Sequence, residues 1–290
     1  MVEPLYLKGP LVRVRPWDHD AQDQKGPRAL KLITWNVNSI RQRLPRLLAV
    51  LGRHDPDIVC LQETKVVDEA FPTMELAAAG YHPVTFGQRA YNGVATLARQ
   101  NPARVTRGFP GDPTPEASRV IVCRVGDLAV VNVYVVNGKA VGDPAYLTKL
   151  AWLDAFGIWI RAAFDPAEPL VIVGDFNVAP DDRDVYAPEA WRGKNLATSA
   201  ERERIADLRT WGLTDLSRDF SGDVDGPFTF WDYRMGAFHR GWGLRIDLAL
   251  GTSTVASRLS EVMVDREERK ETTGEGKPSD HAPLIITLRD

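Results

Sequence analysis

Eight runs rich in Val, Ile and Leu recur along the chain at the length typical of β-strands. Their apolar residues are nearly continuous rather than alternating with polar ones, and this pattern is typical of strands buried on both faces of a sheet. The pattern predicts strands at residues 31–37, 57–63, 94–98, 119–125, 129–135, 170–175, 244–250 and 283–288.

Two helices are predicted between these strands, over residues 146–164 and 199–211. The first carries one apolar stripe at three- and four-residue spacing, formed by Leu150, Leu153, Gly157, Ile160 and Phe164. Because buried strands need cover on both faces, the pattern favours an α/β fold in which two sheets pack face to face with helices outside.

Length and composition fit one large domain preceded by an arm. The chain has 290 residues, of which 44% are hydrophobic and 26% charged, enough for a sizeable core. Residues 1–29 contain prolines and mixed charges without sustained periodicity. We therefore predict a flexible or surface-draped N-terminal arm over residues 1–29, with a short edge strand at 12–15, and a single domain over residues 30–290.

Composition also weighs against several protein classes. No apolar run approaches the ~20 residues that span a bilayer, and the start of the chain lacks a basic segment followed by an apolar stretch, so we expect neither a membrane partner nor a secretory signal. Cys60 and Cys123 lie inside apolar runs, which favours two buried free thiols in the cytoplasm over a disulfide or a metal site. The net charge of −3 is uninformative about nucleic acid, because a metal-binding carboxylate cluster itself lowers it.

Polar side chains stand at the ends of six predicted strands. Taken singly, each has a structural explanation, such as capping a turn or pairing with a lysine. Together, carboxylate, amide and imidazole groups suit a hard divalent cation, an activated water and a charged phosphate. The residues are Asn36, Glu63, Tyr134, Asn137, Asp175, Asn177, Asp247, Asp280 and His281.

Six motifs in order along the chain carry a family resemblance. They are Thr34 to Arg41, Leu61 to Lys65, Tyr91 to Ala95, Gly174 to Asn177, Phe228 to Arg234 and Ser279 to Pro283. In these motifs the chain resembles the exonuclease III family of abasic-site DNA endonucleases, within the superfamily that includes DNase I. The resemblance runs from Lys31 to about Leu288 and implies a four-layered α/β sandwich, with two packed mixed sheets flanked by helices and the active site at one end.

The resemblance also implies roles for the strand-end residues. Glu63 would hold Mg²⁺ or Mn²⁺ with help from Asn36, and Asp280 would be a further carboxylate on the metal side. Asp175 would orient and deprotonate the attacking water, and Asn177 would hold that water or a phosphate oxygen, both beside the metal.

The other roles that the resemblance implies concern the phosphate. His281, oriented by Asp247, would donate hydrogen bonds to it, and Tyr134 would contact it or assist the leaving oxygen. Water attack on a phosphodiester needs this combination of base, Lewis acid and oxyanion donors.

Contacts to double-stranded DNA are implied for a further set of residues. Phe230, Leu244 and Ile246 would surround a pocket for a deoxyribose without a base, although Trp231 beside them has an equally good explanation as core. Arg41, Arg43 and Arg46 either contact phosphates or form a solvated helix face. The remaining residues of the implied DNA surface are Lys65, Tyr91, Asn137, Lys139, Arg234 and Trp242, in a basic and aromatic neighbourhood that also contains Arg240 and Arg245.

Some alternatives stay open. The chain departs from the family pattern at Val136, where proline is common, and at Leu244, where some members have tryptophan. A phosphodiesterase or phosphatase acting on a non-DNA phosphoester would lack the loop from Phe230 to Arg234, and a non-catalytic DNA-binding module would tolerate loss of Asp175 or His281, which are both present. We expect a monomer that acts on duplexes with abasic sites or blocked 3′ ends, with the balance of incision, 3′→5′ exonuclease and 3′-phosphatase activity undecided.

Overall fold

The computed structural model describes residues 29–290, and the strands of this part form two six-stranded sheets. The first sheet contains β1 (Leu30–Asn36), β2 (Ile58–Gln62), β3 (His82–Phe86), β4 (Val94–Ala98), β11 (Leu259–Val264) and β12 (Leu284–Leu288). The second contains β5 (Ala103–Arg107), β6 (Val120–Val125), β7 (Leu128–Tyr134), β8 (Leu170–Asp175), β9 (Leu213–Asp215) and β10 (Asp247–Thr252). Their orders are β11-β12-β1-β2-β4-β3 and β5-β6-β7-β8-β10-β9.

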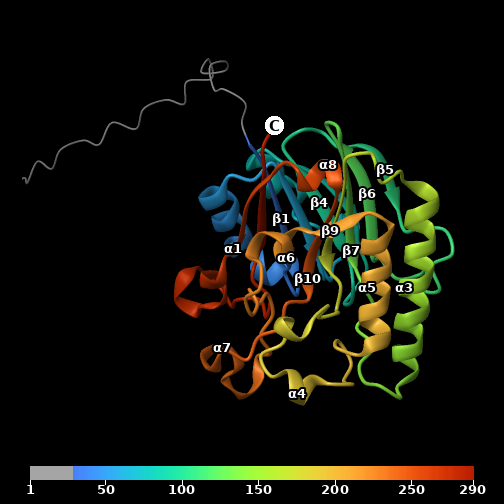
Figure 1. Ribbon diagram of the computed structural model, residues 1–290. Helices are drawn as coiled ribbons and strands as arrows, with labels where there is room; N and C mark the ends of the chain where they lie inside the picture. Colours follow the sequence, from blue (N-terminus) through green and yellow to red (C-terminus); the bar gives the residue numbers. More distant parts are fainter. Residues whose placement is uncertain (1–28) are drawn as a thin grey trace, which may run out of the picture.

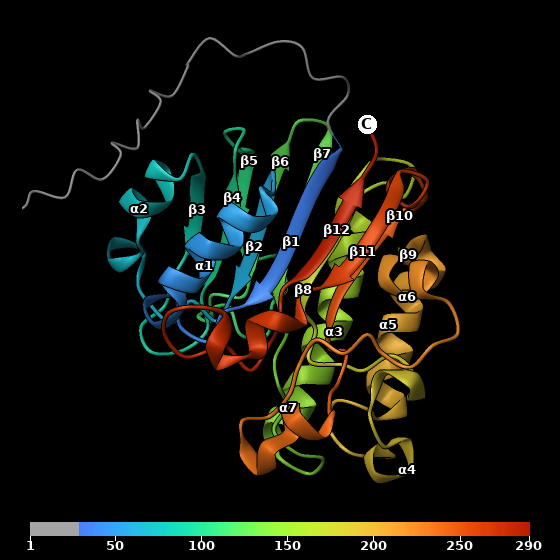
Figure 2. The ribbon, with the colours of Figure 1, turned by 90° about the vertical axis from the view of Figure 1, so that its left-hand side faces the viewer.

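Both sheets are mixed, and helices cover their outer faces. The pairs β1–β2 and β7–β8 are parallel, whereas the other neighbours run antiparallel. Helices α1 (Ile40–His54) and α2 (Thr73–Ala78) lie outside the first sheet in Figure 2, and α3 (Pro144–Ala163) and α5 (Ser199–Trp211) lie outside the second in Figure 1. The predicted four-layered sandwich with two mixed sheets is therefore confirmed.

Alternate residues along the central strands fill different cores. In β1, Leu32 belongs to the apolar core between the sheets, whereas Ile33 packs toward the helices. In β8, Val171 and Val173 face the other sheet, and Ile172 packs toward the helix layer of the second sheet. Because each central strand is buried on both faces, its sequence is nearly continuous in apolar residues.

Seven of the predicted strands are confirmed to within one residue at each end, namely β1, β2, β4, β6, β7, β8 and β12. The prediction at 244–250 was wrong at its start, since β10 begins at Asp247. Residues 244–246 leave the sheet because Leu244 instead forms isolated bridges with Val185 and Phe230. The four strands that the pattern missed, β3, β5, β9 and β11, are the edge strands of the two sheets.

Both predicted helices are confirmed as α3 and α5, although the buried face of α3 differs from the predicted stripe. Leu153, Gly157 and Ile160 are buried as expected, whereas Leu150 and Phe164 are partly exposed. The buried face also includes Tyr146, Lys149, Trp152 and Phe156. The face is wider than the stripe because α3 contacts both the second sheet and α5.

Three further predictions concern the N-terminal arm, membrane-spanning segments and the cysteines. The predicted arm and its edge strand at 12–15 lie outside the described residues, apart from residue 29. Among residues 29–290, no helix has the length and apolar character needed to cross a membrane. Cys60 and Cys123 are confirmed as buried free thiols, and burial raises the pKa of both.

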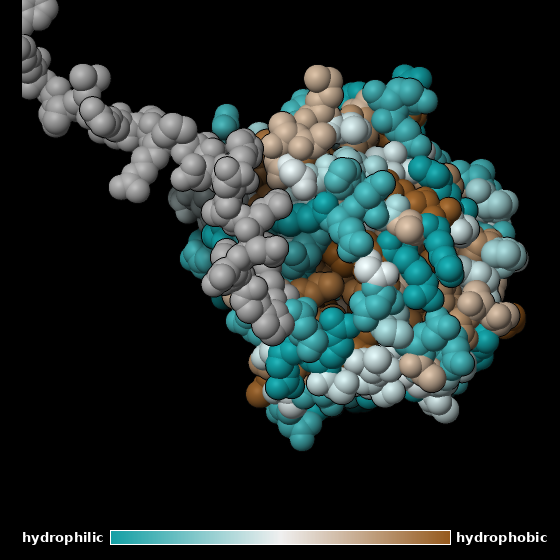
Figure 3. Space-filling model, turned by 90° about the horizontal axis from the view of Figure 1, so that it is seen from above, coloured by the Kyte–Doolittle hydropathy of each residue, from teal (hydrophilic) through white to brown (hydrophobic). Residues whose placement is uncertain are grey.

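One end of the sandwich carries the longest connections. Strands β1 and β8 run downward in Figure 2 and end toward the side where the short helices α4 (Pro188–Trp191) and α7 (Ala237–Arg240) lie on loops. The opposite end, seen from above in Figure 3, is mainly hydrophilic around a small hollow that contains hydrophobic residues. The remaining short helices are α6 (Leu216–Ser221) and α8 (Ser253–Ala256).

Candidate active site

Five polar side chains meet where strands of both sheets end. Asn36 ends β1, Glu63 follows β2, and Asp175 ends β8. Asp247 begins β10 directly opposite Asp175 in antiparallel register, and His281 lies three residues before β12. Because β10 and β12 run antiparallel to their neighbours, their N-terminal ends lie beside the C-terminal ends of the other three strands.

The Asn36 side chain links two carboxylates across the two sheets. Its Nδ2 donates to Glu63 Oε1 at 2.8 Å and to Asp175 Oδ2 at 2.9 Å. Its Oδ1 accepts a hydrogen bond from the backbone N–H of Asn38 at 3.0 Å. Asn36 therefore acts here as a bridge between the carboxylates, with its own oxygen already engaged.

His281 is held between two buried carboxylates. Its Nδ1 lies 2.8 Å from Asp247 Oδ2, and its Nε2 lies 3.8 Å from Asp175 Oδ2. Burial alone lowers the pKa of His281, but the two carboxylates outweigh it and raise this pKa above its usual value. The imidazole is therefore protonated at neutral pH, so that Nδ1 donates to Asp247 and the Nε2 proton faces the cleft.

The carboxylates of Asp175 and Glu63 have opposite pKa shifts. Burial raises the pKa of Asp175, and the charges of Asp247 and Glu63 act in the same direction against the opposing effect of His281. Burial also acts to raise the pKa of Glu63, but Lys65, whose Nζ lies 2.7 Å from Glu63 Oε2, helps to lower it. Titratable groups whose environments move their pKa values apart are typical of catalytic sites.

The backbone is strained at this end of the sheets. Glu63 and Asn177 both have φ of 51°, in the left-handed region that non-glycine residues rarely adopt. At Gly174, a Cβ atom would lie 1.9 Å from the oxygen of Val133, so only glycine allows β7 and β8 to approach this closely before the chain turns. Strain of this kind persists where the surrounding structure holds it, and it concentrates at functional sites.

Asn177 and Tyr134 extend the group along the second sheet. Asn177 donates from Nδ2 to the oxygen of Val135 at 3.0 Å and accepts at Oδ1 from Asn137 Nδ2 at 2.8 Å. Burial, with the nearby charges of Glu63 and Asp175, raises the pKa of Tyr134 well above its usual value. The phenol therefore keeps its proton and remains a hydrogen-bond donor.

The donor set fits a hard divalent cation, which prefers carboxylate and other oxygen ligands. Ligand atoms of Asp175, Asp247 and His281 lie within 4.8 Å of one another. Asp247 Oδ1 is buried and has no hydrogen-bond partner within residues 29–290, so one acceptor of the group is left free. Asp280, predicted on the metal side, is not one of these three, and its Oδ1 accepts from Asn38 Nδ2 at 3.0 Å.

The residues predicted to contact DNA divide into two groups by exposure. Tyr91, Asn137, Lys139 and Arg234 are exposed, and Trp242 is partly exposed and stacks on Tyr186 with ring centroids 5.6 Å apart. Lys65 is different, because its ammonium group is engaged by Glu63 and by Asn38 Oδ1. Its side chain is partly exposed and pairs with the carboxylate group.

Three apolar residues of the implied DNA surface are buried in the structure. Trp231, Leu244 and Ile246 each have 2% exposure, so their place in the implied DNA surface stays a prediction. Trp231 packs with Ala237 and Ala282, which confirms the alternative explanation that it is core. Phe230 remains partly exposed, rests on the apolar cluster that contains Leu244 and Ile246, and lies 4.9 Å from the His281 ring between centroids.

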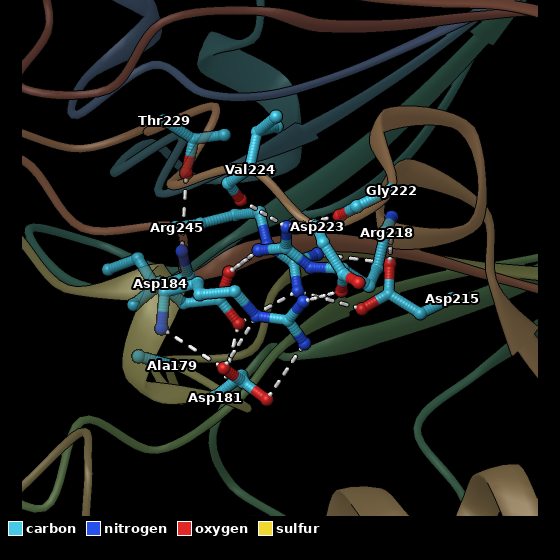
Figure 4. A network of polar contacts seen from close by, with 12 residues as sticks. Ala179, Asp181, Asp184, Asp215, Arg218, Gly222, Asp223, Val224, Thr229 and Arg245 are labelled. Atoms are coloured by element: carbon cyan, nitrogen blue, oxygen red, sulfur yellow. Dashed lines mark hydrogen bonds and ion pairs between the residues drawn. The ribbon is translucent and has the colours of Figure 1, made fainter.

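Arg245, the last residue of the basic and aromatic run, is buried and faces two carboxylates. Its guanidinium donates two hydrogen bonds to Asp184, at 2.7 and 2.9 Å, and two to Asp215, at 3.0 and 2.9 Å. Figure 4 shows this network, which continues through Arg218 to the oxygens of Gly222 and Val224. Arg245 is therefore an internal anchor of the segment that leads to Asp247.

Arg43 and Arg46 fit neither of their two predicted roles. Both are buried, and they attach α1 to the segment before His281: Arg43 donates to the oxygen of Pro278 at 3.0 Å, and Arg46 donates to the oxygen of Gly276 at 2.9 Å. Beside them a hollow of about 910 Å³ opens next to Asn38 and Lys65. Arg41 remains exposed.

Sequence reasoning missed two residues that support the group. Asn38 connects Asp280 to Lys65, and its place two residues after Asn36 was the available signal. Lys149 is fully buried on α3 and donates to the backbone oxygen of Asn177 at 2.6 Å. Its signal was a lysine at the helical spacing of Leu153, on the apolar side of a predicted helix.

Comparisons with known proteins agree with this geometry. The model of the endonuclease/exonuclease/phosphatase family matches residues 33–281. The exodeoxyribonuclease III of Haemophilus influenzae is 34% identical over 269 residues, which cover 88% of this chain and 98% of that protein. A 3′-5′ exonuclease from Neisseria meningitidis has a TM-score of 0.85 at 39% identity, covering 90% of this chain and all of that one. An AP endonuclease from Archaeoglobus fulgidus has the same TM-score at 35% identity, covering 90% and 99%.

Proposed function

Because this chain belongs to the endonuclease/exonuclease/phosphatase family, we propose that it is a DNA repair nuclease that cleaves the phosphodiester 5′ to an abasic site. The observation that carries the proposal is the buried group of Asp175, Asp247 and His281, joined through Asn36 to Glu63. It combines a base of raised pKa, a protonated donor and an ionised carboxylate at one point. Hydrolysis of a phosphodiester uses a base, an oxyanion donor and a Lewis acid, and the ionised carboxylate is the group that would hold the Lewis-acid cation.

The cation in this proposal is Mg²⁺ or Mn²⁺. Glu63 would hold it with help from Asn36, and Asp175, Asn177 and Asp280 would be further ligands. When bound, the cation supplies Lewis-acid stabilisation of the charge that develops on the phosphate. Oxygen ligands are the ones these two cations prefer.

The side chains around the cation have separate roles in the proposed reaction. Asp175 takes the proton of the attacking water, and its backbone-anchored neighbour Asn177 orients that water or a phosphate oxygen. His281 donates from Nε2 to a phosphate oxygen while Asp247 keeps the ring in place, so its positive charge is already oriented when the transition state forms. The protonated phenol of Tyr134 assists the leaving oxygen.

The substrate is proposed to be double-stranded DNA with abasic sites or blocked 3′ ends. Phe230 is the part of the apolar cluster that reaches the surface beside His281, so a sugar without a base would pack on it where an intact nucleotide would collide. The exposed side chains of Lys139, Arg234 and Tyr91 would contact the backbone around it. We further propose that the enzyme acts as a monomer in the cytoplasm, where its two free thiols would stay reduced.

A second candidate activity is 3′-end processing at the same site. The Neisseria protein is described as a 3′-5′ exonuclease and, in a structure with a product DNA hairpin, as a 3′ phosphatase. At 39% identity over 90% of this chain, it is similar enough to favour this activity alongside incision. Both activities hydrolyse a phosphoester with the same metal and base.

One preparation assayed on three duplexes tests the proposal. The duplexes carry an abasic analogue, a recessed 3′ end or a 3′-phosphate, and each is incubated with Mg²⁺, with Mn²⁺ or with EDTA. We expect metal-dependent incision 5′ to the abasic analogue, with 3′-end activity measured in parallel, and no reaction in EDTA. Cleavage that persists in EDTA, or no cleavage of any of the three duplexes with Mg²⁺ or Mn²⁺, would contradict the proposal.

A further inference from the structure

Lys149 is a buried lysine in the helix layer behind the candidate active site. It lies near the start of α3, and neither its side chain nor that of its partner Glu201 on α5 has exposed surface. Its Nζ donates to the backbone oxygen of Asn177 at 2.6 Å, to Asn195 Oδ1 at 3.3 Å and to Glu201 Oε1. A charged lysine is rarely buried without a partner, and here one hydrogen bond goes beyond the partner to the loop after β8.

Asn177 connects this lysine to the catalytic carboxylate. Its backbone N–H donates to Asp175 Oδ1 at 2.9 Å, while its own oxygen accepts from Lys149. The peptide units on both sides of Asn177 are thus held by hydrogen bonds. The φ of Asn177 is 51°, in the left-handed region that asparagine adopts more readily than most residues, and these two hydrogen bonds fix the backbone there.

Through Asn195, the ammonium group of Lys149 also connects the loop after β7 to the loop after β8. Asn195 contacts Lys149 and donates from Nδ2 to the backbone oxygens of Asn137 at 2.8 Å and Lys139 at 3.2 Å. A Cβ atom at Gly138 would lie 2.9 Å from both Asn195 Oδ1 and Lys149 Cδ. The loops after β7 and β8 are therefore packed onto this side chain without spare room.

We propose that Lys149 is a positioning residue of the nuclease reaction: it holds the backbone of Asn177, and through it the carboxylate of Asp175, in the orientation that the attacking water needs. The inference rests on the proposed function. A role in stability alone is the weaker explanation, because a buried ion pair often adds no stability over a well-packed apolar pair. Activity is far more sensitive to small displacements, since a shift of about 1 Å in a reacting group lowers a rate by about a hundredfold.

Two variants remove the same ion pair from opposite sides. Lys149→Met deletes the ammonium group at nearly constant side-chain length, so the Asn177 oxygen loses its donor. Glu201→Gln removes the opposite charge but leaves Lys149 free to donate to Asn177, and Glu201 takes no part in the proposed chemistry. Thermal unfolding, kcat and KM on the abasic duplex are measured for both, at a temperature where both are folded.

We expect Lys149→Met to lower kcat by about tenfold to a hundredfold with little change in KM, because the defect concerns the transition state rather than DNA binding. Glu201→Gln should keep kcat within about twofold of wild type even if it loses as much thermal stability. Equal losses of kcat in Lys149→Met and Glu201→Gln, or wild-type kcat in Lys149→Met, would overturn the inference.

Amide NMR of the metal-free protein separates this inference from the proposed function. The signal of the Asn177 amide, which donates to Asp175, should move in Lys149→Met and much less in Glu201→Gln, whether or not the duplex is cleaved. If the amide signal of Asn177 does not move in Lys149→Met, the positioning role is wrong. If the wild-type protein has no nuclease activity, the proposed function is wrong. Should Lys149→Met fail to fold, the neutral double variant Lys149→Met/Glu201→Gln takes its place with the same expected loss of kcat.

Discussion

Arg234 and Arg245 lie eleven residues apart in one loop, and the structure predicts opposite consequences for their removal. The Arg245 side chain is 2% exposed and bonds to Asp184 and Asp215, whose side chains are 0% and 2% exposed. The Arg234 side chain is 85% exposed, and its carboxylate partner is Asp232, two residues away. Substituting the two arginines therefore separates an internal anchor from a surface contact.

The magnitude for Arg245→Met follows from the charges that it leaves behind. Asp215 loses both of its guanidinium contacts and keeps the backbone N–H of Arg218 at 3.1 Å, while Asp184 keeps the Arg218 side chain. Removing one member of a buried ion pair costs about 3–5 kcal/mol of unfolding free energy, because a charge stays buried and unpaired. At about 2 °C for each kcal/mol in a domain of this size, the unfolding midpoint should fall by about 6–10 °C.

Arg234→Ala should leave the midpoint where it is, because an exposed pair contributes little to stability. It should instead weaken binding to every duplex and reduce the slope of log Kd against log salt, since a phosphate contact releases counterions and carries little sequence information.

The assay combines thermal unfolding with duplex binding at several salt concentrations, below the midpoint of both variants. A wild-type midpoint for Arg245→Met, or a reduced salt slope for Arg245→Met and not for Arg234→Ala, would refute this assignment.

Four further substitutions test other parts of the molecule. Asp175→Asn should abolish Mg²⁺-dependent cleavage while the unfolding midpoint stays equal or rises, because burial disfavours the charge that it removes; substantial turnover would refute its role as base. His281→Asn should lower kcat without changing the metal concentration that gives half-maximal activity. Loss of metal binding in this variant would show instead that His281 is a metal ligand. Phe230→Ala should reduce the preference for abasic over intact duplex at unchanged duplex affinity. An equal loss of activity on both duplexes, together with a lower unfolding midpoint, would show instead that Phe230 is part of the core. Burial acts to raise the pKa of Asp265, but hydrogen bonds, including that from His54, lower this pKa overall. The ionised carboxylate therefore stabilises the folded protein fully above its unfolded pKa, and this stabilisation is lost in acid. The free energy of urea unfolding of Asp265→Asn should accordingly depend less on pH than that of the wild type below about pH 5.

The local sequence was sufficient for the central strands and for the chemistry at their ends. A strand buried on both faces must be apolar at nearly every position, so β1, β8 and β12 are readable from residue type alone. The residues at the C-terminal end of β8 and just before β12 lie together at one end of the sheets, which is why Asp175 and His281 were recognisable as partners 106 positions apart.

The four edge strands and the burial of individual side chains were decided by tertiary structure. An edge strand needs little apolar surface, as in β5, where all five residues are exposed, so its sequence does not differ from that of a loop. A residue type also does not state its surroundings: Arg245 and Lys149 are charged but internal, because Asp184, Asp215 and Glu201 from other segments compensate them. Such compensation depends on contacts between residues far apart in the chain, and the pattern of neighbouring residues carries no record of them.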